Sequence, residues 1–397
     1  MPTSALARPP EDRLLLCCAR TSRSPEVAEQ IETLLQEDMD WEYLIRTARR
    51  HGITPLVYWH LSAISPKTVP ESAFQELRGY FHANNLYNLL LTGELLKILS
   101  LFKAHGILAV PYKGPALAAS VYGNLALREF SDLDILLRRR DVLKAKELLA
   151  SLRYIPRYQL NRAQETALLN DQHQYIFMRD DEKCAVELHW EITEHFSFSL
   201  DPERMWRRLE QMTLAGDTVP TLSPEDTLLI LCAHGAKHIW EQLEWICDVA
   251  ELIRAYRGIR WERVIVQASE LGGERMLLLG LFLAHELLEA PLPEKISQRI
   301  NADPTVKALG RQIGAQLFRE ASTLGGVFKE AYFHPLHLKM KESLADKIRY
   351  CVRAATTQTV DDWELVSLPN FLLPLYYVLR PIRLAAKYVT RLLRRPS

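Results

Sequence analysis

Alternating apolar and polar residues predict a short strand that carries two aspartates. Leu133, Ile135 and Leu137 share one face of this strand, because successive side chains point to opposite sides. Asp132 and Asp134 project together from the other face. Two carboxylates this close repel each other unless a cation lies between them, and aspartate oxygens suit Mg²⁺. The pattern therefore indicates a divalent metal site, although a strand with a solvated second face would show the same alternation.

A glycine turn and a short helix are predicted before this strand. Residues 106–112 form an apolar run typical of a buried strand, and Gly114 and Pro115 open a helical pattern that stops at Gly123. Such a turn presents unpaired backbone N–H groups, which suit an anion such as phosphate. Lys113 beside the turn supplies a positive charge. A glycine that only permits a tight turn is the alternative interpretation.

A third carboxylate is expected on a later hairpin. Residues 174–178 and 184–190 are predicted to form two strands joined by a polar turn at 179–183. Glu187 and His189 share one face of the second strand. If the hairpin lies beside the first strands, Glu187 joins the two aspartates; otherwise the alternation marks only an exposed face.

A helix is predicted to begin at Ser223, with a serine N-cap, a proline at the first position and acids in the first turn. Spacings of three and four place a stripe along one side of it: His234, His238, Glu241, Trp245 and Asp248. The stripe, with Lys237 beside it, can line a catalytic cleft and reach a phosphate, or it can be a hydrogen-bonded structural stripe. Zinc is disfavoured, because no glutamate follows the first histidine and no cysteine pattern lies nearby.

The order of these parts resembles the nucleotidyltransferase superfamily typified by DNA polymerase beta. That order is strand, glycine turn, helix, a strand with Asp-x-Asp and a later strand with a third acid. Residues 112–117, 128–134, 187–190 and 234–238 are similar to a bacterial family described as uncharacterised nucleotidyltransferases. The resemblance implies an α+β fold, in which a small mixed sheet with flanking helices is embedded in a largely helical chain.

The resemblance also implies a reaction and a set of site residues. The reaction is transfer of a nucleoside monophosphate from an NTP to a hydroxyl-type acceptor, with release of pyrophosphate. Two Mg²⁺ ions, or Mn²⁺ in their place, are expected to assist the transfer. The expected catalytic and metal-binding residues are Asp132, Asp134 and Glu187. By the same resemblance, Gly114 is the phosphate-binding turn. The residues themselves add further expected nucleotide contacts: Lys113 and Arg128, which could instead be surface charges, Ser131, which could be an ordinary loop serine, and His234, Lys237 and His238 of the predicted helix.

Composition limits the expected partners. The 49 basic and 49 acidic residues cancel, which argues against a surface that coats nucleic acid. A small molecule, a glycan precursor or a protein is therefore expected as acceptor in preference to RNA. The six cysteines form no metal or disulfide pattern and are expected to be reduced, and no secretory signal or membrane-spanning run is apparent, which favours the cytoplasm. A catalytically inert nucleotide-binding module in a larger assembly remains the alternative function.

Four parts are expected along the chain: an N-terminal helical region at 1–84, a catalytic core at 85–200, a helical domain over the cleft at 201–290 and a C-terminal helical region at 291–397. Long helical patterns run over 25–50 and 73–104. The last residues are rich in arginine and lysine. This basic tail is interpreted as a docking helix, with contact to an anionic membrane or an RNA backbone as the alternatives.

Overall fold

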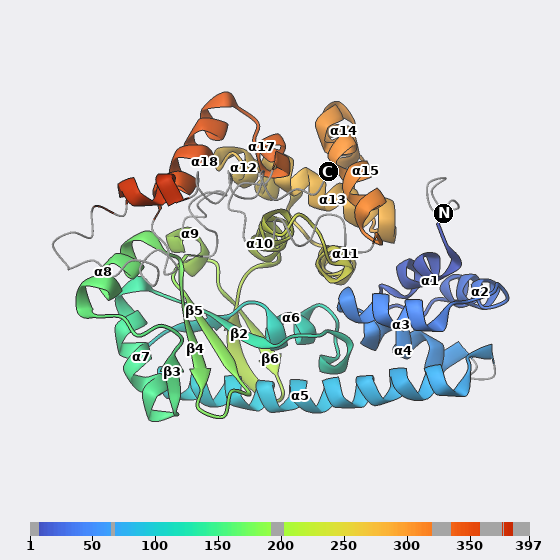
Figure 1. The fold of residues 1–397 in the computed structure, drawn as a ribbon, viewed down its shortest axis with the longest axis horizontal. Helices are drawn as coiled ribbons and strands as arrows, with labels where there is room; N and C mark the ends of the chain where they lie inside the picture. Colours follow the sequence, from blue (N-terminus) through green and yellow to red (C-terminus); the bar gives the residue numbers. More distant parts are fainter. Residues whose placement is uncertain are drawn as a thin grey trace.

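A computed structural model describes residues 8–64, 68–191, 202–319, 335–357, 375 and 377–383 (Figure 1). Helices dominate it, and one small mixed sheet lies among them, which confirms the predicted α+β class. No helix in the described part of the chain is both long enough and apolar enough to cross a membrane.

Five strands form the sheet in the order β1-β2-β5-β4-β3. Their bounds are β1 Ala109–Pro111, β2 Asp132–Leu137, β3 Tyr154–Pro156, β4 Gln174–Arg179 and β5 Ala185–His189. Strands β2 and β5 are parallel, and every other neighbouring pair is antiparallel. The predicted strands are confirmed, and β3 is an edge strand that the sequence pattern did not reveal.

One face of the sheet packs against α5 (Glu71–Ala104) and α7 (Val142–Ser151). Leu133, Ile135 and Leu137 lie in this core with apolar residues of both helices, as the alternation predicted. Helix α5 runs along the whole lower edge of the molecule in Figure 1 and extends from the sheet to the N-terminal helices. It therefore connects the part that carries the aspartates to the rest of the chain.

The opposite side of β1 and β2 belongs to a second core. Val110, Tyr112 and Leu136 lie there with apolar residues of α10 (Pro224–Lys237) and α11 (Leu243–Ala255). Short helix α6 (Gly114–Ser120) and the turn η2 (Leu125–Leu127) lie between the two strands in sequence. The N-terminal helices share this core, so the parts predicted as 1–84 and 201–290 pack together; the four-part division itself stays a prediction.

The remaining elements surround these two cores. They are α1 Pro10–Cys18, α2 Pro25–Leu34, α3 Trp41–Arg50, α4 Thr54–Ile64, η3 Arg139–Asp141, α8 Arg162–Asp171, α9 Pro202–Trp206, α12 Trp261–Glu270, α13 Glu274–Leu288, α14 Glu294–Ala302, α15 Pro304–Gln316, α17 Pro335–Met340 and α18 Leu344–Thr356. A hairpin of β6 (Glu210–Leu214) and β7 (Asp217–Thr221) precedes α10 in the chain. Most of the basic tail, including 384–397, lies outside the described residues.

The single helix predicted from Ser223 to beyond Asp248 is wrong. The chain breaks between α10 and α11, where Ile239 and Trp240 adopt positive φ angles of 56° and 55°. The indole of Trp240 is fully buried and lies against Gly235 and Gly280, which have no side chain in its way. Positive φ angles are unfavourable for residues other than glycine, and burial of this ring stabilises the turn in spite of that cost.

The helix predicted over 25–50 is also interrupted. Helix α2 ends at Leu34, and α3 begins only at Trp41. Asp40 accepts a hydrogen bond from the Tyr43 backbone N–H and so starts a new helix. The pattern over 73–104, in contrast, matches α5 closely.

Replacement of Gly235 by alanine is expected to lower the free energy of unfolding by about 1–3 kcal/mol, because the new Cβ would overlap the rigid Trp240 ring. Gly79 is the matched control. It is an exposed glycine within α5 with open space around its Cα, so Gly79→Ala should raise stability by about 0.5–1 kcal/mol. Urea unfolding of both variants measures the difference, and equal effects would contradict the packing account of the turn.

Candidate active site

The register of β2 with β5 creates the centre of the site. Asp134 pairs with Glu187, and Asp132 pairs with Ala185 two positions earlier. Side chains of directly paired residues in neighbouring strands point to the same face, so Asp134 and Glu187 stand side by side. Residues from distant parts of the chain thus come together through backbone pairing.

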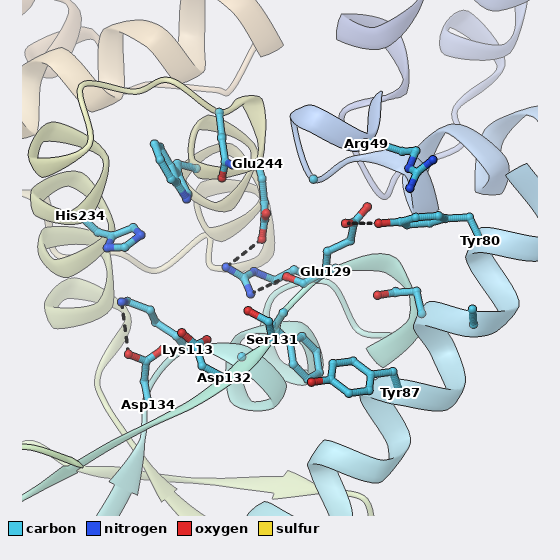
Figure 2. A pocket seen from close by; sticks show the side chains of 18 residues that line it. Arg49, Tyr80, Tyr87, Lys113, Glu129, Ser131, Asp132, Asp134, His234 and Glu244 are labelled. Carbon is cyan, nitrogen blue, oxygen red and sulfur yellow. Dashed lines mark hydrogen bonds and ion pairs between the residues drawn. The ribbon is translucent and has the colours of Figure 1, made fainter. Parts of the chain in front are cut away.

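Three polar side chains lie close to one oxygen of Asp134. Nε2 of His189 lies 3.0 Å from Asp134 Oδ1, and Nζ of Lys113 and the hydroxyl of Tyr112 each lie 3.4 Å from it. The ring of Tyr112 meets that of His189 edge-on at 5.4 Å between centroids. The Asp134 side chain is 5% exposed, so these groups and not water compensate its charge. Figure 2 shows the Lys113 contact.

The two aspartates differ in their affinity for protons. Burial and the negative charges of Asp134 and Glu187 raise the pKa of Asp132 to about 6. Burial acts in the same direction on Asp134, but Lys113 and His189 outweigh it and hold the pKa of Asp134 below its usual range. Asp134 is therefore the permanently ionised member, and Asp132 gains a proton in mild acid.

His189 is a buried polar group of the site. Its Nε2 lies 3.4 Å from Oε2 of Glu187 in addition to its contact with Asp134. Burial disfavours its charged form, but the two carboxylates raise the pKa of His189 above its ordinary value. The sequence pattern predicted that His189 shares a strand face with Glu187, because the two are two positions apart. The contact of His189 with Asp134 is seen only in the fold.

The glycine turn lies directly beside the aspartate strand. Gly114 has a φ of 48°, and a Cβ at this position would lie 3.2 Å from the backbone oxygen of Asp132. Glycine is thus required twice, by the backbone angle and by the close approach. The turn keeps Lys113 over Asp134; its predicted role in phosphate binding stays a prediction.

Arg128 is held by carboxylates of α11. Its Nε and Nη2 donate to both oxygens of Asp248, each at 2.8 Å, and its Nη2 lies 3.1 Å from Glu244. The Tyr122 hydroxyl donates to the same Asp248 at 2.7 Å. Asn88 of α5 donates to the Arg128 carbonyl oxygen at 2.8 Å. This buried network attaches the loop before the aspartates to the helical region, so the Arg128 charge is compensated within the protein.

Two adjoining cavities meet at the aspartates. The larger, about 650 Å³, is bordered by residues of α3, α5 and α11 and by the loop before β2, and Figure 2 shows it from close by. The smaller, about 280 Å³, lies between the sheet and α10. The cavities have four residues in common: Lys113, Asp132, Asp134 and His234.

Every residue predicted for the site lines at least one cavity. The larger cavity alone takes in Gly114, Arg128 and Ser131, and the smaller alone takes in Glu187, Lys237 and His238. The roles assigned to these residues remain predictions, because their placement does not test them.

Several residues that the sequence patterns did not single out also line the cavities. Tyr80 and Tyr87, on one side of α5, border the larger one, and Tyr80 donates to Glu129 at 3.1 Å. Tyr112 and His173 border the smaller one. The spacing of seven between the two tyrosines is a helical signal, but nothing local shows that this side of α5 faces a cavity and not water.

The three ring-bearing residues of the predicted stripe after Ser223 lie together in spite of the break between α10 and α11, whereas Glu241 is exposed and Asp248 pairs with Arg128. The rings of His234 and His238 lie 4.7 Å apart, and Trp245 of α11 lies 5.5 Å and 4.9 Å from them. Burial and the nearby Lys113 charge hold the pKa of His234 below its ordinary value, so this imidazole is neutral. The ring cluster forms one wall where the two cavities meet.

Asp134, Glu187 and His189 form a group that fits a metal ion. Each offers one ligand atom, and these atoms all lie within 4.8 Å of one another. Two ligands about 2.1 Å from one ion and at right angles to each other are about 3.0 Å apart, which is the separation of His189 Nε2 from Asp134 Oδ1. Asp132 is not a member of this group, and its predicted metal contact stays a prediction.

The sheet, with Asp-x-Asp on one strand and a third acid on its parallel neighbour, defines the core that the sequence led us to expect for a nucleotidyltransferase. Residues 37–289, which are 253 of the 397 residues, match the model of a family described as uncharacterised nucleotidyltransferase. The chain therefore belongs to this family, which confirms the resemblance. No curated protein is similar enough to the chain to add a substrate.

Replacement of Arg128 by methionine is expected to cost about 3–5 kcal/mol of stability, because Asp248 and Glu244 would remain buried without their cation. Arg204→Met is the matched control: Arg204 and Glu270 are about half exposed, and such a pair contributes less than about 1 kcal/mol. Urea unfolding at neutral pH compares the two. Equal losses would show that the buried network does not anchor α11.

Asp132→Asn is expected to stabilise the metal-free protein at pH 7 by roughly 1–3 kcal/mol. The folded protein holds the Asp132 proton up to a pKa of about 6, whereas the unfolded chain releases it near 4. Wild-type stability therefore falls, relative to the variant, as pH rises from about 4 to 6, and the two converge below pH 4. Urea unfolding in chelator at several pH values measures this difference, and a difference independent of pH would contradict the assignment.

Proposed function

We propose that this protein transfers a nucleoside monophosphate from an NTP to a hydroxyl-type acceptor, with Mg²⁺ and with release of pyrophosphate. The observation that carries the proposal is the in-register pairing of Asp134 with Glu187 at the junction of two cavities. A transfer between two substrates needs one compartment for each, with the charged groups between them. Family membership supports the same class of reaction.

The larger cavity is assigned to the NTP. Its volume of about 650 Å³ lies in the range of ligand pockets. The glycine turn, Lys113 and Ser131 lie at its inner end beside the aspartates, where the phosphates would be bound. Tyr80 and Tyr87 of α5 also line this cavity and offer aromatic surface against which a base and sugar would lie.

The smaller cavity is assigned to the acceptor. It contains Glu187, and its volume of about 280 Å³ admits a small molecule or the end of a larger one. Gln174 and His173 of the sheet side, with Lys237 and His238 of α10, supply polar groups for its recognition. This assignment agrees with a small molecule, a glycan precursor or a protein side chain as acceptor.

In the proposed step, the acceptor oxygen forms a bond to the α-phosphorus while the bond from that phosphorus to the pyrophosphate oxygen breaks. Glu187 takes the acceptor proton. Lys113 and the turn at Gly114 hold the phosphates in line with the acceptor. Mg²⁺ bound by Asp132, Asp134 and Glu187 would offset the negative charge that develops on the phosphate oxygens. Most of the rate enhancement then comes from orientation and electrostatics.

Asp134→Asn is expected to reduce pyrophosphate release by at least about a hundredfold, since it removes the carboxylate that the other site groups surround. The experiment titrates ATP, CTP, GTP and UTP into the purified protein with Mg²⁺, following binding by calorimetry and pyrophosphate by a coupled assay. Asp217→Asn, at the exposed turn of the β6–β7 hairpin, is the control and should keep wild-type values.

Three results of this titration would contradict the proposal. Metal-dependent NTP binding without pyrophosphate release in any acceptor mixture would favour the inert nucleotide-binding module. Full pyrophosphate release by Asp134→Asn, or no binding of any NTP by the wild type, would remove this site from the mechanism.

A further inference from the structure

His189 combines deep burial with an unusual lack of hydrogen bonds. Its side chain is 4% exposed, and neither ring nitrogen has a hydrogen bond of acceptable geometry. Nε2 nevertheless lies 3.0 Å from an oxygen of Asp134 and 3.4 Å from an oxygen of Glu187. A buried polar atom without a partner is costly, so an arrangement of this kind requires something to satisfy it.

A metal ion satisfies all three groups at once. His189 and the two carboxylates each offer one ligand atom, and these three atoms lie within 4.8 Å of one another. Their closest separations, 3.0 Å and 3.4 Å, are those of adjacent ligands around a single ion. Tyr112 packs edge-on against the imidazole and restrains its orientation.

We propose that His189 is a direct metal ligand together with Asp134 and Glu187, and that this position takes a first-row transition-metal ion such as Mn²⁺ in preference to Mg²⁺. The inference rests on the proposed function only for the use of this ion in nucleotidyl transfer. Its chemical basis is the ligand set: Mg²⁺ favours oxygen ligands and keeps several waters, whereas an imidazole nitrogen favours transition metals.

The proposal changes what the two sides of the site would bind. Asp132 is not a member of the three-ligand group, and its side chain offers only oxygen atoms, which suit Mg²⁺ carried by a nucleotide. The group around Glu187 on the side of the smaller cavity contains the nitrogen. One centre can thus hold two ions of different kinds.

The test measures metal binding directly, without nucleotide. Metal-free protein at pH 7.5 is titrated with MnCl₂ and separately with MgCl₂ by calorimetry. Pulsed electron paramagnetic resonance of the Mn²⁺ complex then detects any directly bonded nitrogen. We expect a nitrogen coupling typical of one imidazole, and binding of Mn²⁺ at least about tenfold tighter than that of Mg²⁺.

His189→Asn should remove the nitrogen coupling and weaken Mn²⁺ binding about 10- to 100-fold, with little change for Mg²⁺. His173→Asn is the matched control. Its ring lies 6.1 Å from that of His189 and borders the same cavity, but it is not a member of the three-ligand group. This variant should keep the coupling. Thermal unfolding of both variants checks that each is folded.

Absence of a bound nitrogen in the Mn²⁺ complex would overturn the proposal. A ratio of Mn²⁺ affinity to Mg²⁺ affinity that is the same in the wild type and in His189→Asn would also overturn it. Failure to bind Mn²⁺ at all would do the same. His189 would then be a buried imidazolium that pairs with the two carboxylates in place of an ion. Failure of the proposed function gives a different pattern, in which the nitrogen coupling is present but no NTP yields pyrophosphate.

Discussion

The parallel pairing of β2 with β5 is the constraint on which the site depends. It sets Asp134 opposite Glu187, so that two carboxylates from separate segments share one face of the sheet. No local turn joins these strands, because a parallel pair needs a long connection, here through α7, β3, α8 and β4. A slip of one residue would turn Glu187 into the core behind the sheet and place Val186 or Leu188 beside Asp134.

Positive charge makes this concentration of acids tolerable. Lys113 and His189 keep Asp134 ionised in a buried position, whereas Asp132 is left with a raised pKa. The negative charge of Asp132, which lines the larger cavity, is therefore less well compensated than that of Asp134. A buried carboxylate beside two others lowers stability, which is typical of a functional site. A cationic ligand would offset the repulsion among these carboxylates.

A second buried ion pair determines the positions of the elements that form the walls of the larger cavity. Arg128, four residues before Asp132, is bound by Asp248 and Glu244 of α11. The helical region is thus fastened at the entrance of the aspartate strand, and the break at Trp240 turns α11 back toward it. The larger cavity exists because these two elements meet there while α5 forms its opposite wall.

Much of the core could be predicted from the sequence, and the limits have physical causes. The alternation around Asp132 and Asp134, the glycine turn and the long helix α5 are local patterns, and the structure confirms them. The partner of Arg128 lies 120 residues away, and no local signal identifies a contact that forms only on folding. The stripe from His234 to Asp248 was predicted on one helix, and the rings meet across a turn because burial of Trp240 outweighs local helical preference.

The residues that line the larger cavity show the same limit of prediction from local sequence patterns. Tyr80 and Tyr87 appear in the sequence as ordinary helical positions, and their placement on the wall of this cavity follows from how α5 packs in the fold. His189 was visible on the Glu187 face, but its approach to Asp134 depends on the strand register. Residue types and spacing thus identify the acids, whereas the groups that surround them follow from packing.

The most direct test of the account is a crystal structure with Mn²⁺ and a nonhydrolysable NTP. An anomalous difference map locates the manganese independently of any assumption about the site. The account predicts a manganese peak at Asp134, Glu187 and His189, with the phosphates in the larger cavity beside Gly114 and Lys113. Well-ordered nucleotide and manganese at any other place on the protein would contradict it.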